Sequence, residues 1–375
     1  MDVRVEVAVV GAGVVGLAVA AELARDRTVA VIERHESYGR ENSSHNSGVV
    51  HAGIYYPPNW LKTTLCVEGN PLLYEWAEQH KVRARRVGKL IIAVSEEELP
   101  ALDALHASAS ANGVPELSML SRRQVQALEP AIAAEAALFS GSTGVVDQME
   151  LMRSLLNAAQ EHGALVAFKH TLEAVQRVDG GFALTVVDPD SAPLTVAASA
   201  LVNSAGLSAD RVASMLSYPL DGTAEVPRLR QRVVKGRYYD IVASKKAAQL
   251  KHLIYPLPHS DRSGLGVHVT LDVDGGVHLG PDTEWLDPEA ALDYRSDDTR
   301  RAAFVDSARR YLPWLEMDDV APGQVGYRTK LHGEGEGPCD FLVWHDHGYV
   351  HLGGIESPGM TASLALARRV REILG

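Results

Sequence analysis

Cysteine is scarce in this sequence of 375 residues, which contains only Cys66 and Cys339. The two residues form no Cys-x-x-Cys pair and no spacing typical of metal ligands. No cluster of histidine, cysteine, aspartate and glutamate has metal-ligand spacing either. The sequence therefore predicts no metal site, and it indicates a reducing compartment.

The sequence also lacks a long hydrophobic run that could direct it to or through a membrane. The most apolar stretch, VAVVGAGVVGLAVAAELA at residues 7–24, is interrupted by three glycines. The residues before it include Asp2, Arg4 and Glu6, so no positively charged region precedes the run. We expect no targeting segment and no spanning helix, hence a cytoplasmic protein. Loose association with the inner face of the membrane is left open.

Basic residues are in deficit, with 36 lysines and arginines against 48 aspartates and glutamates and a net charge of −12. A balance this acidic argues against nucleic acid as a partner. Apolar residues make up 46% of the chain, an ordinary share for a globular protein. The length allows two packed units.

A glycine-rich turn near the start is the clearest motif. The run Val5–Val10 predicts a strand, Gly11, Gly13 and Gly16 follow as G-x-G-x-x-G, and residues 17–26 have a helix pattern. A second predicted strand, 28–33, ends at Glu33. The glycines allow a tight turn and close approach of the backbone to a pyrophosphate, which the helix N-terminus would bind. Glu33 would accept a ribose hydroxyl, which predicts a dinucleotide site and leaves NAD or FAD open.

Predicted α/β segments flank a β-rich region that begins near Pro227. This arrangement favours a Rossmann-like cofactor domain interrupted by an inserted β-rich (α+β) substrate domain, an α/β fold overall. We expect residues 1–84, 142–222 and 326–375 to form the discontinuous cofactor domain, and residues 85–141 and 223–325 to form the substrate domain. Helices are expected at 61–80, 96–112 and 299–311, and a hairpin at 264–280.

Several further segments carry a family resemblance. NSSHNSGVVHAGIYYPP at 42–58, GYRTKLHGEGE at 326–336 and GIESPGMTASLALA at 354–367, with the opening glycine turn, resemble the L-2-hydroxyglutarate dehydrogenase and oxidase family. These are FAD enzymes of the broader glycine oxidase and D-amino-acid oxidase superfamily. The resemblance runs through essentially the whole chain. It implies that the dinucleotide is FAD and that residues after the second strand run beside the flavin.

The resemblance, together with the glycine turn, assigns the cofactor contacts. Small and polar residues permit close approach to a flat cofactor and hydrogen bonding to its rim, and the helix N-terminus near Pro358 would stabilise the reduced flavin. The expected FAD-binding residues are Gly11, Gly13, Val15, Gly16, Glu33, Arg34, Ser43, Ser44, Asn46, Ser47, Gly48, Leu172, Ala205, Gly206, Gly354, Ile355, Glu356, Ser357, Pro358, Gly359 and Met360.

The same resemblance places a carboxylate-binding arginine at Arg328. A planar guanidinium binds a carboxylate with two hydrogen bonds, whereas Lys330, two residues on along a predicted strand, would take a second carboxylate. The alternative is two solvated charges near a turn. His51 and His268 are the candidates for the base, because histidine titrates in the range that alcohol deprotonation needs. Which one acts is left open, and Tyr55 and Tyr255 are expected to contact the substrate.

These assignments imply an FAD-dependent enzyme that oxidises a small 2-hydroxy acid, L-2-hydroxyglutarate before others, to the 2-oxo acid by hydride transfer to flavin N5. An FAD-dependent amino-acid or amine oxidase of the glycine oxidase type is the alternative, because the fold and the arginine would serve both. The expected partners are a small anionic substrate and an electron acceptor, which is oxygen, a quinone or an electron-transfer protein.

Overall fold

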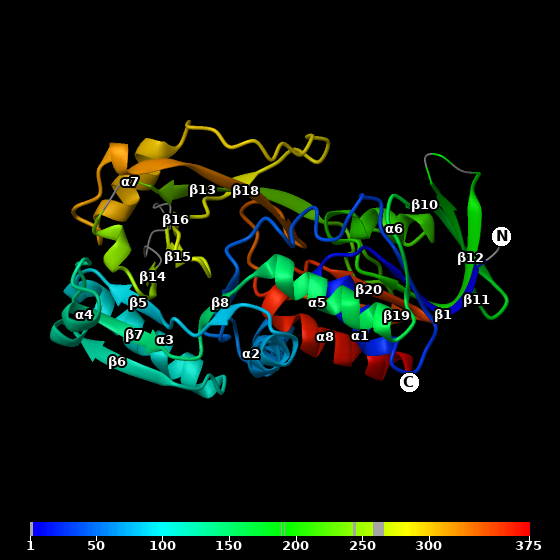
Figure 1. Cartoon of the computed structure of the whole chain (residues 1–375), viewed down its shortest axis with the longest axis horizontal. Coiled ribbons are helices and arrows are strands. Elements are labelled where there is room, and N and C mark those ends of the chain that lie inside the picture. The colour runs from blue at the N-terminus through cyan, green and yellow to red at the C-terminus, as the bar shows by residue number, and fades with distance from the viewer. Residues whose placement is uncertain (1–2, 189, 191, 243–244, 258–265) are drawn as a thin grey trace. The chain divides into compact units, whose positions relative to one another are not determined.

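The structure, a computed structural model, describes residues 3–188, 190, 192–242, 245–257 and 266–375, and divides the chain into two compact units (Figure 1). Unit 1 consists of Met1–Ser44, Gln148–Val233 and Arg328–Gly375, and unit 2 of His45–Asp147 and Val234–Tyr327. Residues 45–84 therefore belong to unit 2, although the sequence placed them in the cofactor domain.

Strand pairing explains this difference. Strand β8 (Gly144–Val146) pairs antiparallel with β3 (Val49–Val50) on one side and with β4 (Ala84–Arg85) on the other. The resulting three-stranded sheet holds the beginning and the end of the segment 45–147 together. The pairing joins residues about a hundred positions apart, so neighbouring-residue patterns do not reveal it.

Unit 1 is built on a parallel sheet. Its five parallel strands have the order β20–β12–β1–β2–β9. Strands β11 and β10 extend the sheet antiparallel from β12, and β19 pairs antiparallel with β20. The bounds are β1 (Val3–Val10), β2 (Val29–Ile32), β9 (Leu165–Ala167), β10 (Thr171–Val178), β11 (Gly181–Val187), β12 (Leu194–Asn203), β19 (Leu342–Asp346) and β20 (Tyr349–Gly353).

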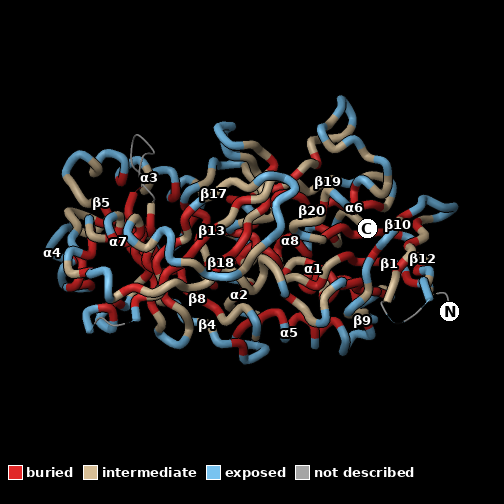
Figure 2. The backbone as a smooth tube through the Cα atoms, turned by 90° about the horizontal axis from the view of Figure 1, so that it is seen from above, coloured by how far each residue is buried: buried red, intermediate tan, exposed pale blue. Residues whose placement is uncertain are grey.

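Helix α1 (Val14–Leu23) packs against α5 (Gln148–Glu161) and α8 (Gly359–Leu374), while α6 (Ala209–Met215) contacts β10, β12 and β20. The predicted strand–glycine turn–helix–strand order is present, and α8 begins at Gly359, directly after Pro358, near which a helix N-terminus was expected. Buried residues follow the strands and α1, whereas many connecting turns are exposed (Figure 2).

Unit 2 contains a nine-stranded sheet of order β17–β13–β16–β15–β14–β5–β7–β6, with β18 beside β13. The expected hairpin is present as β15 and β16 over the described residues 266–280, and residues 264–265 lie outside the described part. The bounds are β5 (Lys89–Ala93), β6 (Leu117–Ser121), β7 (Ala136–Ser140), β13 (Arg232–Ile241), β14 (Leu253–Pro256), β15 (Val269–Leu271), β16 (Val277–Leu279), β17 (Glu284–Trp285) and β18 (Val320–Lys330).

The helices of unit 2 are α2 (Leu61–His80), α3 (Leu99–Ala111), α4 (Arg122–Leu128) and α7 (Arg301–Arg309). The predicted helix at 61–80 coincides with α2. Residues of α3 and α7, among them Leu102 and Phe304, share one hydrophobic cluster with the strands. No helix in the described part of the chain is long and apolar enough to cross a membrane.

The register of the unit 2 sheet places Lys89 and Tyr255 on one face. Leu253 lies beside Lys89 and Tyr255 beside Ile91, so these side chains project to the same side of the sheet. Ile254, paired with Val269, projects from the opposite face. Apolar residues of both faces belong to one hydrophobic cluster, so the ammonium of Lys89 stands among buried side chains.

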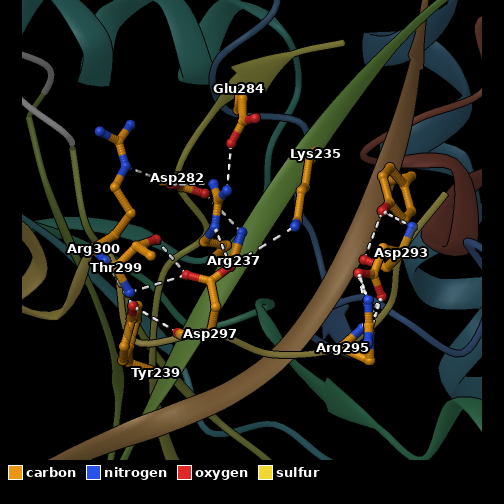
Figure 3. A network of polar contacts seen from close by, with 11 residues as sticks. Lys235, Arg237, Tyr239, Asp282, Glu284, Asp293, Arg295, Asp297, Thr299 and Arg300 are labelled. Carbon is orange, nitrogen blue, oxygen red and sulfur yellow. Dashed lines mark hydrogen bonds and ion pairs between the residues drawn. The ribbon is translucent and has the colours of Figure 1, made fainter. Parts of the chain in front are cut away.

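Charged residues in the middle of β13 are paired within unit 2. Figure 3 shows Arg237 among three carboxylates, with Asp282 at 3.3 Å, Glu284 at 2.5 Å and Asp297 at 3.2 Å. Although burial alone would lower it, the pKa of Arg237 is raised by the hydrogen bonds that it donates to Glu284 and Asp297. Lys235 contacts Asp297 at 3.9 Å, and Arg300 contacts Asp282 at 3.5 Å. Each of these cations therefore has a carboxylate partner inside the unit.

Gly16 permits the closest backbone approach in unit 1. A Cβ atom added there would lie 2.0 Å from the Gly11 carbonyl oxygen and 2.7 Å from the Ser204 hydroxyl oxygen. We expect Gly16→Ala to lower the thermal unfolding midpoint by about 4 °C or more, because α1 would have to move off β1 and β12. Gly337→Ala is the matched control, since nothing lies within 4 Å of a Cβ at that position. Equal midpoints for the two variants, measured by circular dichroism, would refute the close-packing argument.

Candidate functional site

The glycine turn of unit 1 leaves room for an anion at the start of α1. Gly11 has a φ of +99°, and its N–H donates to the Ile32 carbonyl at 2.8 Å, which closes the turn against β2. A Cβ at Gly13 would lie 2.9 Å from the Ser43 hydroxyl oxygen, which accepts a hydrogen bond from the Val14 N–H at 3.0 Å. The first turn of α1 contains no acidic residue. It can therefore bind a pyrophosphate.

Glu33 is fixed at the end of β2. Its Oε2 accepts the Ala12 N–H at 2.7 Å and its Oε1 accepts the His35 N–H at 2.8 Å. Each carboxylate oxygen has two lone pairs, so both retain capacity for a ribose hydroxyl. Arg34 is more exposed, forms an ion pair with Glu41 and donates to the Ser208 hydroxyl at 3.2 Å.

Gln231 joins the two later segments assigned to the cofactor, a role that the sequence analysis missed. Its Nε2 donates to the Gly206 carbonyl at 2.8 Å, and its Oε1 accepts the Gly354 N–H at 2.8 Å. The residue is 8% exposed. Asn203 adds a contact through Oδ1, which accepts the Ala205 N–H at 3.3 Å. The segment after β12 and the segment after β20 are thus held together by side chains of unit 1.

Lys330 has a protein partner, which counts against its expected role in binding substrate. Its Nζ lies 2.5 Å from a Glu356 carboxylate oxygen, and both side chains are largely buried. Arg328 and Lys330 alternate with the buried Tyr327 and Thr329, as predicted for a strand. Sequence alternation identified the shared face but gave no sign of the acidic partner. The pair orders the segment that leads into α8.

Two other predicted cofactor contacts have structural roles of their own. Leu172 lies in the hydrophobic cluster of unit 1. Asn46 in unit 2 accepts the Gly48 N–H through Oδ1 at 2.9 Å, and its carbonyl accepts from Gln324 at 2.8 Å. These contacts shape the loop around residues 45–48. A role toward the cofactor stays a prediction for these residues and for Ser44, Ser47, Ile355, Ser357, Pro358 and Met360.

Two asparagines hold the loop that carries His51. Asn70 on α2 donates through Nδ2 to the His51 carbonyl at 2.8 Å and to the Ser142 carbonyl at 3.0 Å. Asn112, at the end of α3, donates to the Tyr56 carbonyl at 3.0 Å. Gly53 has a φ of +90° inside this loop. Hydrogen bonds from other elements therefore fix this loop at both ends, unlike a surface loop that makes no such contacts.

Four of the predicted residues of unit 2 gather around one that was not predicted, and we call the five together the polar cluster. The His268 ring stacks on Tyr255, with centroids 3.8 Å apart and an interplanar angle of 12°. The Lys89 ammonium lies 4.6 Å from the centroid of Tyr255 and 5.1 Å from that of Tyr55. His51 is close enough for its titration to respond to both Lys89 and His268. Lys89 was overlooked because it stands in the apolar run GKLIIAV.

Burial dominates the electrostatics of this cluster. Desolvation, followed by the charges of Lys89 and His268, holds the pKa of His51 well below its usual value. Desolvation lowers the pKa of Lys89 to about 8, and it raises the pKa of the neighbouring Cys66 thiol to about 12. At neutral pH, His51 is therefore a neutral base, Lys89 is mostly a cation, and Cys66 is a neutral thiol.

Comparisons with known proteins identify the family to which the chain belongs. The family profile described as DAO, FAD dependent oxidoreductase, matches residues 6–373. The chain is 36% identical to L-2-hydroxyglutarate dehydrogenase, mitochondrial, from Arabidopsis thaliana, over 98% of this chain and 83% of that one. It is 30% identical to glycerol 3-phosphate dehydrogenase from Caloramator mitchellensis, over 98% and 73%. L-alpha-glycerophosphate oxidase from Mycoplasma pneumoniae, solved with FAD bound, has the same fold, with a TM-score of 0.83, 24% identity and coverage of 99% and 94%.

Substitution of Gln231 tests whether its bridge between the segments around Gly206 and Gly354 supports cofactor binding. We expect Gln231→Leu to lose most of its FAD, because both hydrogen bonds between the segments around Gly206 and Gly354 disappear. Gln231→Glu, which keeps the acceptor for the Gly354 N–H, is expected to retain more. The measurement is flavin absorbance per protein after purification, with circular dichroism as the control for folding. Full flavin content in a folded Gln231→Leu would show that the bridge does not support the cofactor.

Proposed function

Because the chain belongs to the family of FAD-dependent oxidoreductases, we propose that it oxidises a small 2-hydroxy acid to the 2-oxo acid, with L-2-hydroxyglutarate as the preferred substrate. The observation that carries the proposal is the 36% identity to an L-2-hydroxyglutarate dehydrogenase over 98% of this chain. The polar cluster of unit 2 supports it, because it combines a neutral histidine with a buried cation suited to an anionic substrate.

The cofactor is FAD, and the residues of unit 1 fit it. The turn Gly11–Gly16 and the start of α1 would hold the pyrophosphate, and Glu33 would accept from the ribose. The segments around Gly206 and Gly354, joined by Gln231, would hold the remainder. FAD, when bound, accepts the two electrons released by oxidation of the alcohol.

The protein's own residues bind the acid and remove the hydroxyl proton. Arg328 binds the carboxylate next to the reacting carbon through its planar guanidinium. His51 accepts the hydroxyl proton as the C–H bond breaks and the carbonyl forms, because its lowered pKa keeps it neutral. His268, stacked on Tyr255, lines the same polar cluster and orients the substrate hydroxyl.

A substrate panel tests the proposal. Reduction of bound FAD is followed without oxygen after adding L-2-hydroxyglutarate, lactate, glycerol 3-phosphate or glycine. We expect the fastest reduction with L-2-hydroxyglutarate. Reduction by glycerol 3-phosphate alone would favour the activity named for the Caloramator relative. Reduction by glycine alone would favour an amino-acid oxidase, the activity that the resemblance left as the alternative.

The pH profile reports the state of His51. The base must be neutral to act, and its pKa lies well below 6.5. We therefore expect kcat/KM to stay level as the pH falls from 7 to about 6.5 and to decrease only below that value. His51→Gln should lower kcat by about a hundredfold or more and abolish this acidic limb. If the decrease of kcat/KM at acidic pH remains in His51→Gln, another group accepts the hydroxyl proton, and His268 is the next candidate.

Arg328 is tested by a change that preserves its charge. We expect Arg328→Lys to lower kcat/KM on the preferred acid by at least about tenfold, because lysine cannot form the paired hydrogen bonds to a carboxylate. Flavin content should stay normal, since the guanidinium is assigned to substrate and not to FAD. The matched control is Arg369→Lys on the exposed side of α8, where the arginine contacts Glu372 at 3.0 Å. Unchanged kcat/KM in Arg328→Lys would exclude the carboxylate role.

A further inference from the structure

Lys89 is a buried cation held by aromatic rings. It is the first residue of β5, is 1% exposed, and projects from the same face of the sheet as Tyr255. Its ammonium group lies 5.1 Å from the ring centroid of Tyr55 and 4.6 Å from that of Tyr255. Each ring attracts the cation through its π face, but neither cancels the charge.

No carboxylate in the part of the chain that the structure describes pairs with this charge. Within the described ranges, Lys89 makes no ion pair and no side-chain hydrogen bond. Other enclosed cations differ in this respect: Arg237 contacts three carboxylates (Figure 3) and Lys330 contacts Glu356. A buried ammonium without a carboxylate is costly to maintain, and the fold retains it beside the groups assigned to catalysis.

The surroundings of Lys89 suit an anion that arrives from outside. His51, His268 and the Cys66 thiol are all neutral or cationic at neutral pH, so none of them repels a carboxylate. Tyr55 is 37% exposed, so the cluster reaches the surface of unit 2 at that ring. An anion beside Lys89 would also gain hydrogen-bond donors from the tyrosine hydroxyls and the imidazoles.

We propose that Lys89 binds a second carboxylate of the substrate and thereby makes the enzyme selective for 2-hydroxy acids with two carboxylates over those with one. This inference rests on the proposed function. The sequence analysis assigned the second carboxylate to Lys330. We assign it to Lys89 instead, because Lys330 already pairs with Glu356.

The decisive variant is Lys89→Met, which removes the charge and nearly preserves the volume. The ratio of kcat/KM for L-2-hydroxyglutarate to kcat/KM for L-2-hydroxybutyrate should fall at least about tenfold, chiefly through KM for the dicarboxylate. Lys235→Met is the matched control, since it removes the same charge from unit 2 at a lysine that has Asp297 as its partner. There the ratio should not change. An equal loss for both acids in Lys89→Met would overturn the assignment.

Binding of glutarate separates this inference from the proposed function, because glutarate has two carboxylates and no hydroxyl to oxidise. Calorimetry on the FAD-loaded enzyme should show at least about tenfold weaker glutarate binding in Lys89→Met, and less than about threefold weaker butyrate binding. One outcome is that glutarate binding depends on Lys89 but the enzyme oxidises no 2-hydroxy acid. That outcome would refute the proposed function and leave Lys89 as a binding residue for a dicarboxylate. Glutarate binding that is unaffected by the substitution would refute the inference alone.

Thermal stability distinguishes a binding lysine from a structural one. If the charge is kept for a ligand, Lys89→Met should raise the unfolding midpoint of the ligand-free enzyme at pH 7 by about 2 °C or more. It should also reduce the additional stabilisation that glutarate gives to the unmodified enzyme. A lower midpoint in Lys89→Met, with the glutarate stabilisation intact, would show that the ammonium serves the fold and would contradict the proposal.

Discussion

The close approach of α1 to the parallel sheet is the constraint on which the rest of unit 1 depends. With glycine at position 16, the helix contacts the Gly11 carbonyl and the Ser204 side chain directly, so β1, β12 and α1 meet at one point. Their meeting fixes the tight turn at Gly11, and the first turn of α1, where we expect the pyrophosphate, contains no acidic residue. The segments joined by Gln231 complete the same half of the structure.

Unit 2 depends on a different principle, a large hydrophobic cluster that holds polar groups within it. The cluster joins apolar side chains of the nine-stranded sheet with those of α3 and α7, and this packing supplies the stability. The unit can then carry groups that are unfavourable for stability, namely the neutral His51 and the buried ammonium of Lys89. Functional residues commonly occupy such positions, because stability elsewhere in the domain offsets their cost.

Local patterns in the sequence predicted most elements of the fold. The helix at 61–80, the described part of the hairpin at 264–280 and the glycine turn were confirmed, because each depends on residues that are neighbours along the chain. The placement of 45–84 was wrong relative to the compact units, since it depends on pairing between distant strands. His268 and Tyr255 were found as candidates, but their stacking and the ammonium of Lys89 beside them depend on sheet register, which the sequence does not display.

The pairing of β5 with β14 also governs when the chain can finish folding. Lys89 and Leu253 are neighbours in this parallel pair, although 253 − 89 = 164 residues separate them along the chain. Contacts of such long range form late and slowly, because the intervening chain must be ordered before they are gained. During synthesis, β5 therefore emerges long before its partner and presents an unpaired edge. The ring of Tyr255 reaches the ammonium of Lys89 only when β14 has paired with β5, so we expect the cluster around Lys89 to be completed late in folding.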